Sequence, residues 1–111
     1  MVAHSGVVMN MVALSLAAGL LAASIAQAQE PQALLKSHNC TICHATEEAG
    51  AGPAFVDIAV KYKGNAKAAA ILRSVVKNGK HGSGPWHMPP FQDVPDDDAE
   101  KMVQYILSLK P

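Results

Sequence analysis

The chain has 111 residues, enough for one small domain, and its nine Lys and Arg side chains balance its nine Asp and Glu side chains. Nucleic-acid-binding surfaces carry an excess of basic charge, so this formally neutral chain is not expected to bind nucleic acid. A domain of this size buries little apolar surface, and we therefore expect an additional stabilising group inside it.

Residues 1–28 have the pattern of a secretory signal peptide. An uncharged apolar run covers residues 7–25 and ends at the small-x-small cleavage pattern Ala26-Gln27-Ala28. The segment before the run contains His4 but no Lys or Arg, so the usual positive start is missing. An uncleaved membrane anchor is the alternative. We expect cleavage, which leaves a single domain over residues 29–111 in the periplasm.

The first predicted helix leads directly into a cofactor-attachment motif. Residues 31–39 favour a short helix with proline in its first turn. Residues 40–44 read Cys-Thr-Ile-Cys-His, the C-x-x-C-H signature of c-type haem attachment. Cys40 and Cys43 can each bond one porphyrin vinyl group, and the imidazole of His44 can reach the iron. The chain has no other cysteine, which argues against a zinc site, and no βαβ pattern is visible for a thioredoxin-like motif.

Helical signals continue along the chain, and no strand is predicted. Apolar residues at helical spacing mark residues 54–63 and, after the break at Gly64, residues 66–78. A C-terminal helix is predicted over residues 96–110, where three aspartates at its start favour the positive end of the helix dipole. The apolar stripe of that helix is expected to form core.

A loop rich in Gly and Pro is predicted over residues 79–90, between the helical stretch that ends at residue 78 and the C-terminal helix. Met88 stands in it just before Pro89 and Pro90, and its thioether is the candidate for the second axial ligand of the iron. His87, one residue earlier, is the rival ligand. We expect His87 to face solvent instead, together with His38 and His81.

With these motifs the chain resembles the small class I bacterial cytochromes c, which carry electrons in periplasmic respiration. The resemblance covers nearly all of residues 31–110. It rests on the haem motif, on the Met-Pro-Pro sequence, and on the segments Gly52-Pro53-Ala54-Phe55, Lys77-Asn78-Gly79, Gly84-Pro85 and Tyr105-Ile106-Leu107. It implies thioether bonds to Cys40 and Cys43, axial ligation by His44 and Met88, and a hydrogen bond from the His44 ring to the Pro53 carbonyl, which would orient that ring.

Three positions depart from the family pattern. His87 precedes the ligand methionine where proline is frequent, and Phe91 follows Pro-Pro where many members have asparagine. The usual Gly-Val-Trp-Gly segment is absent, and Trp86 lies closer to the methionine than the family tryptophan does. These changes bear on hydrogen bonding around the haem and hence on its reduction potential.

The resemblance implies an all-α domain of the cytochrome c fold, with three to five short helices wrapped around one covalently bound haem. The expected function is one-electron transfer between periplasmic redox proteins, a dehydrogenase or reductase on one side and a terminal oxidase or reductase on the other. No set of residues for substrate turnover is evident, so we expect a monomeric carrier that is not an enzyme and has no membrane contact after signal cleavage. Two alternatives remain at this point. The chain could be the dedicated haem subunit of one periplasmic dehydrogenase, such as a sulfite dehydrogenase, or a haem protein that binds or senses a small ligand.

Overall fold

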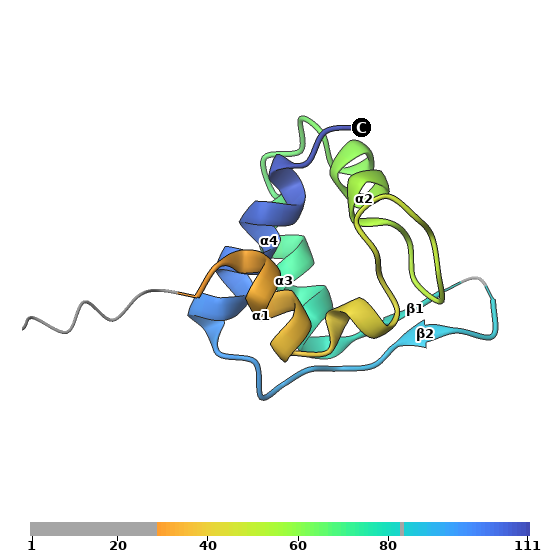
Figure 1. Cartoon of the computed structure of the whole chain (residues 1–111). Coiled ribbons are helices and arrows are strands. Elements are labelled where there is room, and N and C mark those ends of the chain that lie inside the picture. Colours follow the sequence, from red (N-terminus) through yellow and green to blue (C-terminus); the bar gives the residue numbers. More distant parts are fainter. Residues whose placement is uncertain (1–28, 83) are drawn as a thin grey trace, which may run out of the picture.

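The structure is a computed structural model that describes residues 29–82 and 84–111. Its elements follow in the order α1 (Pro31–Ser37), η1 (Cys40–Ile42), α2 (Phe55–Lys61), α3 (Ala68–Asn78), β1 (Lys80–His81), β2 (His87–Met88) and α4 (Asp96–Ser108). Figure 1 shows four helices gathered into one body, with the two short strands at its edge. The predicted signal peptide, residues 1–28, lies outside the described residues.

The predicted helices are present, and each is shorter than its sequence pattern suggests. α1 begins at proline and ends near Asn39, which has a left-handed backbone with φ 63° and starts η1. Gly64, with φ 77°, separates α2 from α3, as expected from a residue that tolerates positive φ. α4 has three aspartates in its first turn and ends before Lys110.

The prediction that the chain has no strand is wrong for the described residues. β1 and β2 form an antiparallel hairpin in which Lys80 pairs with Met88 and His81 with His87. Gly79, with φ 75°, turns the chain out of α3 into the first strand. A β-carbon at Gly79 would lie 2.5 Å from the Met88 carbonyl oxygen, so glycine is needed where the two strands meet.

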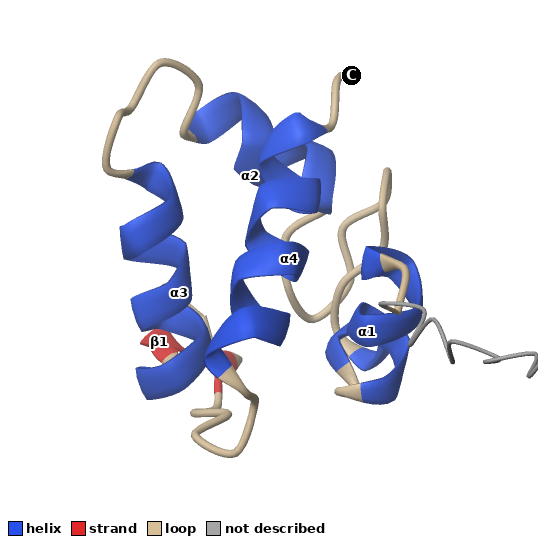
Figure 2. Ribbon diagram, turned by 90° about the vertical axis from the view of Figure 1, so that its left-hand side faces the viewer, coloured by secondary structure: helices blue, strands red, loops and turns tan. Residues whose placement is uncertain are grey.

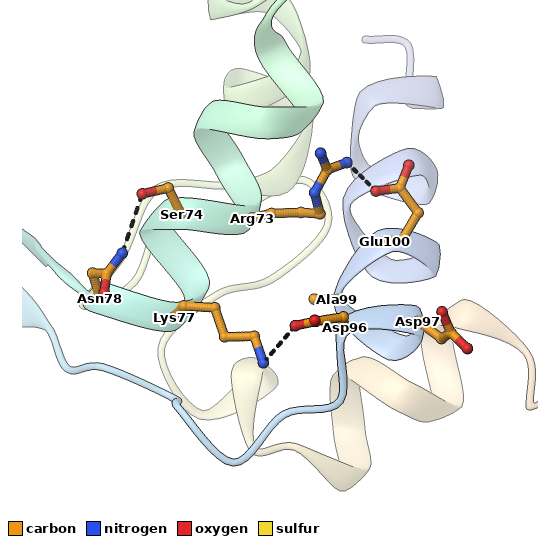
Figure 3. A pocket seen from close by; sticks show the side chains of 8 residues that line it. All are labelled: Arg73, Ser74, Lys77, Asn78, Asp96, Asp97, Ala99 and Glu100. Carbon is orange, nitrogen blue, oxygen red and sulfur yellow. Dashed lines mark hydrogen bonds and ion pairs between the residues drawn. The ribbon is translucent and has the colours of Figure 1, made fainter.

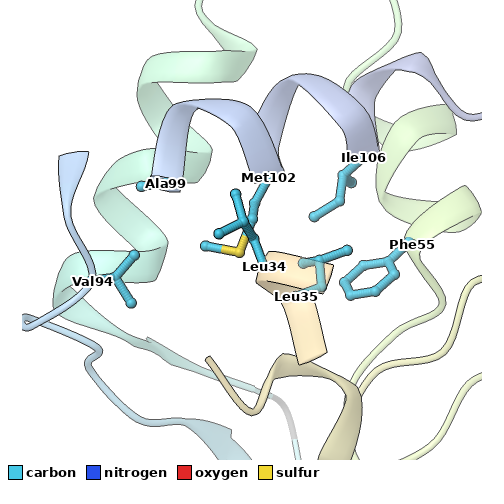
Figure 4. Packing of buried hydrophobic residues seen from close by; sticks show 7 residues of the cluster. All are labelled: Leu34, Leu35, Phe55, Val94, Ala99, Met102 and Ile106. Carbon is cyan, nitrogen blue, oxygen red and sulfur yellow. The ribbon is translucent and has the colours of Figure 1, made fainter. Parts of the chain in front are cut away.

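The hydrophobic core lies where the N-terminal and C-terminal helices meet. Figure 2 shows α4 running alongside α3, with α1 packed on another side of it. In Figure 4, Leu34 and Leu35 of α1 point toward Met102 and Ile106 of α4, and Phe55 of α2 closes the group. Val94 and Ala99 complete this cluster of buried residues. The apolar stripe predicted for the last helix is therefore core.

One histidine is placed differently from the expectation. His38 was expected to face solvent, but its side chain is half-buried and its Nε2 lies 2.9 Å from Oδ2 of Asp98. This contact joins the end of α1 to the first turn of α4. His81 and His87 are exposed, as expected.

Candidate haem site

The Cys-Thr-Ile-Cys-His segment folds into one tight turn. The left-handed backbone of Asn39 redirects the chain, and η1 follows immediately. The backbone N–H groups of Cys43 and His44 both donate to the Cys40 carbonyl, at 3.3 Å and 3.1 Å. The turn brings Cys40 and His44 to the wall of a cleft, whereas Cys43 is exposed and is not among the residues that line it.

The ring of His44 is fixed by its surroundings. Its Nδ1 lies 2.7 Å from the Pro53 carbonyl oxygen, which accepts the Nδ1–H. The ring is stacked on Phe55 with centroids 5.1 Å apart and an interplanar angle of 18°. Because Nδ1 is occupied by this hydrogen bond, Nε2 is the nitrogen left to bind a metal.

The loop between His44 and α2 holds the Pro53 carbonyl in place through backbone hydrogen bonds. The N–H of Gly52 donates to the Cys43 carbonyl at 2.8 Å, and the N–H of Phe55 donates to the Ala45 carbonyl at 2.9 Å. A β-carbon at Gly52 would approach the His44 ring to 2.5 Å. Glycine at this position therefore leaves the space that the imidazole occupies.

The cleft beside His44 is apolar and is walled by all four α-helices together with β2. Its lining residues are Leu35, Cys40, His44, Phe55, Ile58, Leu72, Val75, Val76, Met88, Met102, Val103 and Ile106. Among these lining side chains, the atoms able to bind a metal are the sulfur atoms of Cys40, Met88 and Met102 and the imidazole nitrogen of His44. Burial raises the pKa of the Cys40 thiol, against a smaller lowering by a backbone hydrogen bond.

Met88 and His87 occupy different surroundings, although they are neighbours in β2. Met88 is half-buried and lines the cleft, whereas His87 is exposed and is not among the lining residues. Successive side chains of a strand point to opposite faces, which explains this difference. The structure thus brings Met88, and not His87, to the cleft that Cys40 and His44 also line.

A second groove, lined mostly by polar side chains, lies between α3 and α4 and includes no residue of the haem motif. Figure 3 shows its ion pairs, in which Arg73 contacts Glu100 and Lys77 lies 2.9 Å from Asp96. Lys77 also donates to the Val94 carbonyl. These contacts hold the two helices together, and the groove contains neither a cysteine nor a histidine.

The donor set of the apolar cleft fits a c-type haem. Cysteine sulfur can form the thioethers, and imidazole and thioether are the usual axial ligands of electron-transfer haem. The apolar wall suits a macrocycle that is itself largely apolar, and Gly52 keeps the proximal imidazole free of a steric clash. Pro53 contributes its carbonyl oxygen, which accepts the hydrogen bond from the His44 ring.

Comparison with known proteins gives the family. A family model described as "Cytochrome C oxidase, cbb3-type, subunit III" matches residues 26–106. Cytochrome c-551 of Pseudomonas aeruginosa is 43% identical over 96 residues, which is 86% of this chain and 91% of the relative. Cytochrome c-552 of Nitrosomonas europaea is 42% identical over 95 residues, covering 85% of this chain and 90% of the relative. The crystal structure of wild-type Nitrosomonas europaea cytochrome c552 superposes with a TM-score of 0.67 at 41% identity, over 71% of this chain and 99% of that one.

The chain therefore belongs to the cytochrome c family. The predicted fold class is confirmed, and the protein is a small electron carrier with one covalently bound c-type haem. The two alternatives, a dedicated dehydrogenase subunit and a ligand-sensing haem protein, are not favoured by relatives that are named cytochromes c-551 and c-552.

Sequence reasoning did not identify every residue that shapes the site. The haem motif predicts the roles of Cys40 and His44. The left-handed backbone of Asn39 is not predictable from the sequence, beyond the general tolerance of asparagine for that conformation. The contact of Gly52 with the imidazole also depends on how the loop closes. Such close approaches become visible only when the chain is folded.

Proposed function

We propose that Cys40 and Cys43 form the thioether bonds to the haem and that His44 and Met88 are its axial ligands. The observation that carries this assignment is the meeting of Cys40, His44 and Met88 at one apolar cleft, with His44 Nδ1 already bonded to Pro53. When bound, the haem supplies a one-electron centre whose iron changes between the ferric and ferrous states.

The protein residues have separate tasks in this proposal. Pro53 accepts the Nδ1 proton of His44, and this hydrogen bond sets the ring orientation and makes Nε2 a stronger donor to the metal. Met88 offers a soft sulfur, which favours ferrous iron. The surrounding aliphatic side chains exclude water, so little solvent has to reorganise when the charge of the centre changes.

The assignment also implies that the protein does not turn over a substrate. With His44 and Met88 both bound, the iron has no open position for a small ligand. Electron exchange would then take place with a donor and an acceptor protein, for which the expected classes are a dehydrogenase or reductase and a terminal oxidase or reductase. We propose that the carrier acts as a monomer.

Carbon monoxide binding to the reduced protein tests this closed coordination. The wild-type spectrum should not change when carbon monoxide is added, whereas Met88→Ala should bind it and should also lose the weak long-wavelength band of ferric Met-ligated haem. His87→Ala is the matched control, because the residue is adjacent but faces away from the cleft, and it should behave like the wild type. If instead the His87 change opens the iron and the Met88 change does not, the axial assignment is wrong.

We further propose that residues 1–28 direct export and that residues 29–111 form the periplasmic domain. The support is the apolar run with its Ala26-Gln27-Ala28 ending. Within residues 29–82 and 84–111, none of the helices has the length and apolar character needed to cross a membrane. N-terminal sequencing of the exported protein should begin at Gln29, and a first residue at or near Met1 would indicate an uncleaved anchor.

A further inference from the structure

Two histidines that the haem chemistry does not use face each other on the hairpin. His81 of β1 and His87 of β2 are direct partners in the antiparallel register. Their ring centroids lie 5.6 Å apart with an interplanar angle of 31°. Both side chains are exposed, so their nitrogens are accessible from solvent.

The geometry points to a binding site for a late divalent transition-metal ion, held by the imidazoles of His81 and His87. Imidazole binds copper, nickel and zinc ions well, and the affinity of such sites for divalent ions of this series is highest for copper. We therefore propose that Cu²⁺ is the ion bound most tightly. The remaining positions on the ion would be filled by water. Nothing in the proposed haem function requires these two side chains to be histidine.

The spacing allows both rings to reach one ion. Directly opposed residues of an antiparallel pair have β-carbons about 4.5 to 5.5 Å apart, so their side chains rise from neighbouring points on one face. Two nitrogens bound at about 2.0 Å lie about 2.8 Å apart at neighbouring corners of the tetragonal arrangement that Cu²⁺ prefers, and about 3.3 Å apart in the tetrahedral arrangement of Zn²⁺. Rings with centroids 5.6 Å apart can place one nitrogen each at either separation by rotating about their side-chain bonds.

The hairpin backbone pre-organises the pair. Gly79 is required where β1 passes close to the Met88 carbonyl, and a β-carbon at Gly82 would lie 2.8 Å from the Trp86 carbonyl oxygen. Glycine at both positions allows the backbones to approach closely on either side of His81, and the antiparallel pairing fixes the two histidines opposite each other. Strand alternation places Lys80 on the face opposite His81, so its ammonium group does not occupy the metal site.

The site would be linked to the haem through β2. His87 precedes Met88, the proposed ligand of the iron, in the same strand. A divalent cation bound there adds positive charge near the haem, which favours the ferrous over the ferric state. Binding of a redox-inert ion such as Zn²⁺ should therefore raise the reduction potential of the haem.

Calorimetric titration of the untagged ferric holoprotein with CuCl₂ tests the binding. We expect one ion per chain at the hairpin site of the wild type, and a loss of affinity of roughly tenfold or more in His81→Asn and in His87→Asn, because loss of a direct ligand should cost at least as much as loss of an outer-shell partner. Lys80→Asn is the matched control on the same hairpin and should bind as the wild type does. A double variant, His81→Asn with His87→Asn, reveals any copper held elsewhere, for example at the N-terminal amine.

Spectroscopy gives a second readout that does not depend on affinity alone. The paramagnetic resonance spectrum of the bound Cu²⁺ should show coupling to two imidazole nitrogens, and this coupling should disappear in the double variant. With Zn²⁺, the haem potential should rise in the wild type and stay unchanged in the double variant. Equal copper affinity in the wild type and the double variant would overturn the proposed site, and an equal potential shift in both would overturn its link to the haem. Neither result would bear on ligation by Met88, which the carbon monoxide experiment tests separately.

Discussion

At the scale of single residues, the orientation of the proximal imidazole depends on one small residue and one carbonyl group. Gly52 contacts the ring of His44, and the neighbouring Pro53 accepts its Nδ1 hydrogen. The ring can occupy its place only because position 52 has no side chain. This chain therefore needs glycine at position 52 for steric reasons.

Gly52→Ala should weaken the bond between His44 and the haem iron and alter the haem spectrum. A β-carbon would lie 2.5 Å from Cε1 of His44, which is too close, so the imidazole must move and its bond to Pro53 must distort. We expect a higher reduction potential, because a less strongly donating imidazole stabilises ferric iron less, or a mixed-spin ferric spectrum; voltammetry and absorption spectroscopy measure these changes. Gly84→Ala is the control, because a β-carbon there meets nothing within 4 Å. A Gly52 variant identical to the wild type would show that the ring does not fill this space.

At the scale of the elements, α4 is the helix on which the others pack. Met102 is 1% exposed and lies among Leu34, Leu35 and Ile106, which come from α1 and α4. It also lines the haem cleft. The C-terminal helix thus supplies both the protein core and one wall of the cofactor site.

Met102→Ala should reduce the free energy of unfolding by about 2 to 5 kcal/mol, the usual cost of truncating a large buried aliphatic side chain. Chemical denaturation of the ferric holoprotein, followed by helical circular dichroism, measures this change. Lys101→Ala, one residue earlier on the exposed side of the same helix, should change the free energy by less than about 0.5 kcal/mol. Equal losses in the two variants would contradict the packing described for α4.

The hydrogen-bonded carboxyl group of Glu100 in α4 should make stability depend on acid pH. A hydrogen bond from Gln104 and the contact with Arg73 lower the pKa of Glu100 below its ordinary value of 4.5, against a smaller opposing effect of desolvation. A carboxyl group whose pKa is lower in the folded state stabilises the fold above the pKa of the unfolded chain, and this contribution is lost as pH falls through the folded pKa. Glu100→Gln should therefore lower the denaturation midpoint at pH 6, and the difference from the wild type should shrink below pH 4.5. A difference that persists unchanged at low pH would show that ionisation of Glu100 is not its cause.

Comparison of the elements with their sequence patterns shows how much of the fold the sequence predicts. Apolar spacing predicts the four α-helices, and their ends differ from the prediction by at most two residues. The hairpin was not predictable from periodicity, since each strand is only two residues long. By contrast, the sulfur and imidazole groups expected to bind the haem can be predicted from the haem motif and the Met-Pro-Pro sequence. No local sequence pattern predicts that His81 lies opposite His87, because this depends on the register of the hairpin. The contact of His38 with Asp98 likewise depends on how α1 packs against α4.

At the scale of the whole molecule, two large apolar side chains in the haem-binding segments are exposed, and the polypeptide has no formal net charge. Ile42, between the two motif cysteines, is 77% exposed, and Trp86, two residues before Met88, is 68% exposed. We expect these two side chains to lie within the surface that docks redox partners. Long-range electrostatic steering should contribute little for a formally neutral chain.

Electron-transfer rates with the physiological partner should therefore depend only weakly on salt. We expect a decrease of only about a few-fold between low and physiological ionic strength, as for docking that is mainly apolar. Ile42→Glu should slow the reaction more than Lys110→Glu, which changes charge beyond the end of α4. Stopped-flow kinetics would measure both effects. A steep salt dependence, or equal rates for the two variants, would place the docking surface elsewhere.

The covalent attachment of one haem to Cys40 and Cys43 is the claim on which the rest of the account depends. Intact-mass measurement after extraction with acid acetone tests it most directly, because that treatment removes haem that is not covalently bound. The account predicts a single species with the mass of residues 29–111 plus one haem, and a Cys40→Ala, Cys43→Ala variant without haem. Release of free haem from the wild-type protein, leaving the bare polypeptide mass, would contradict it.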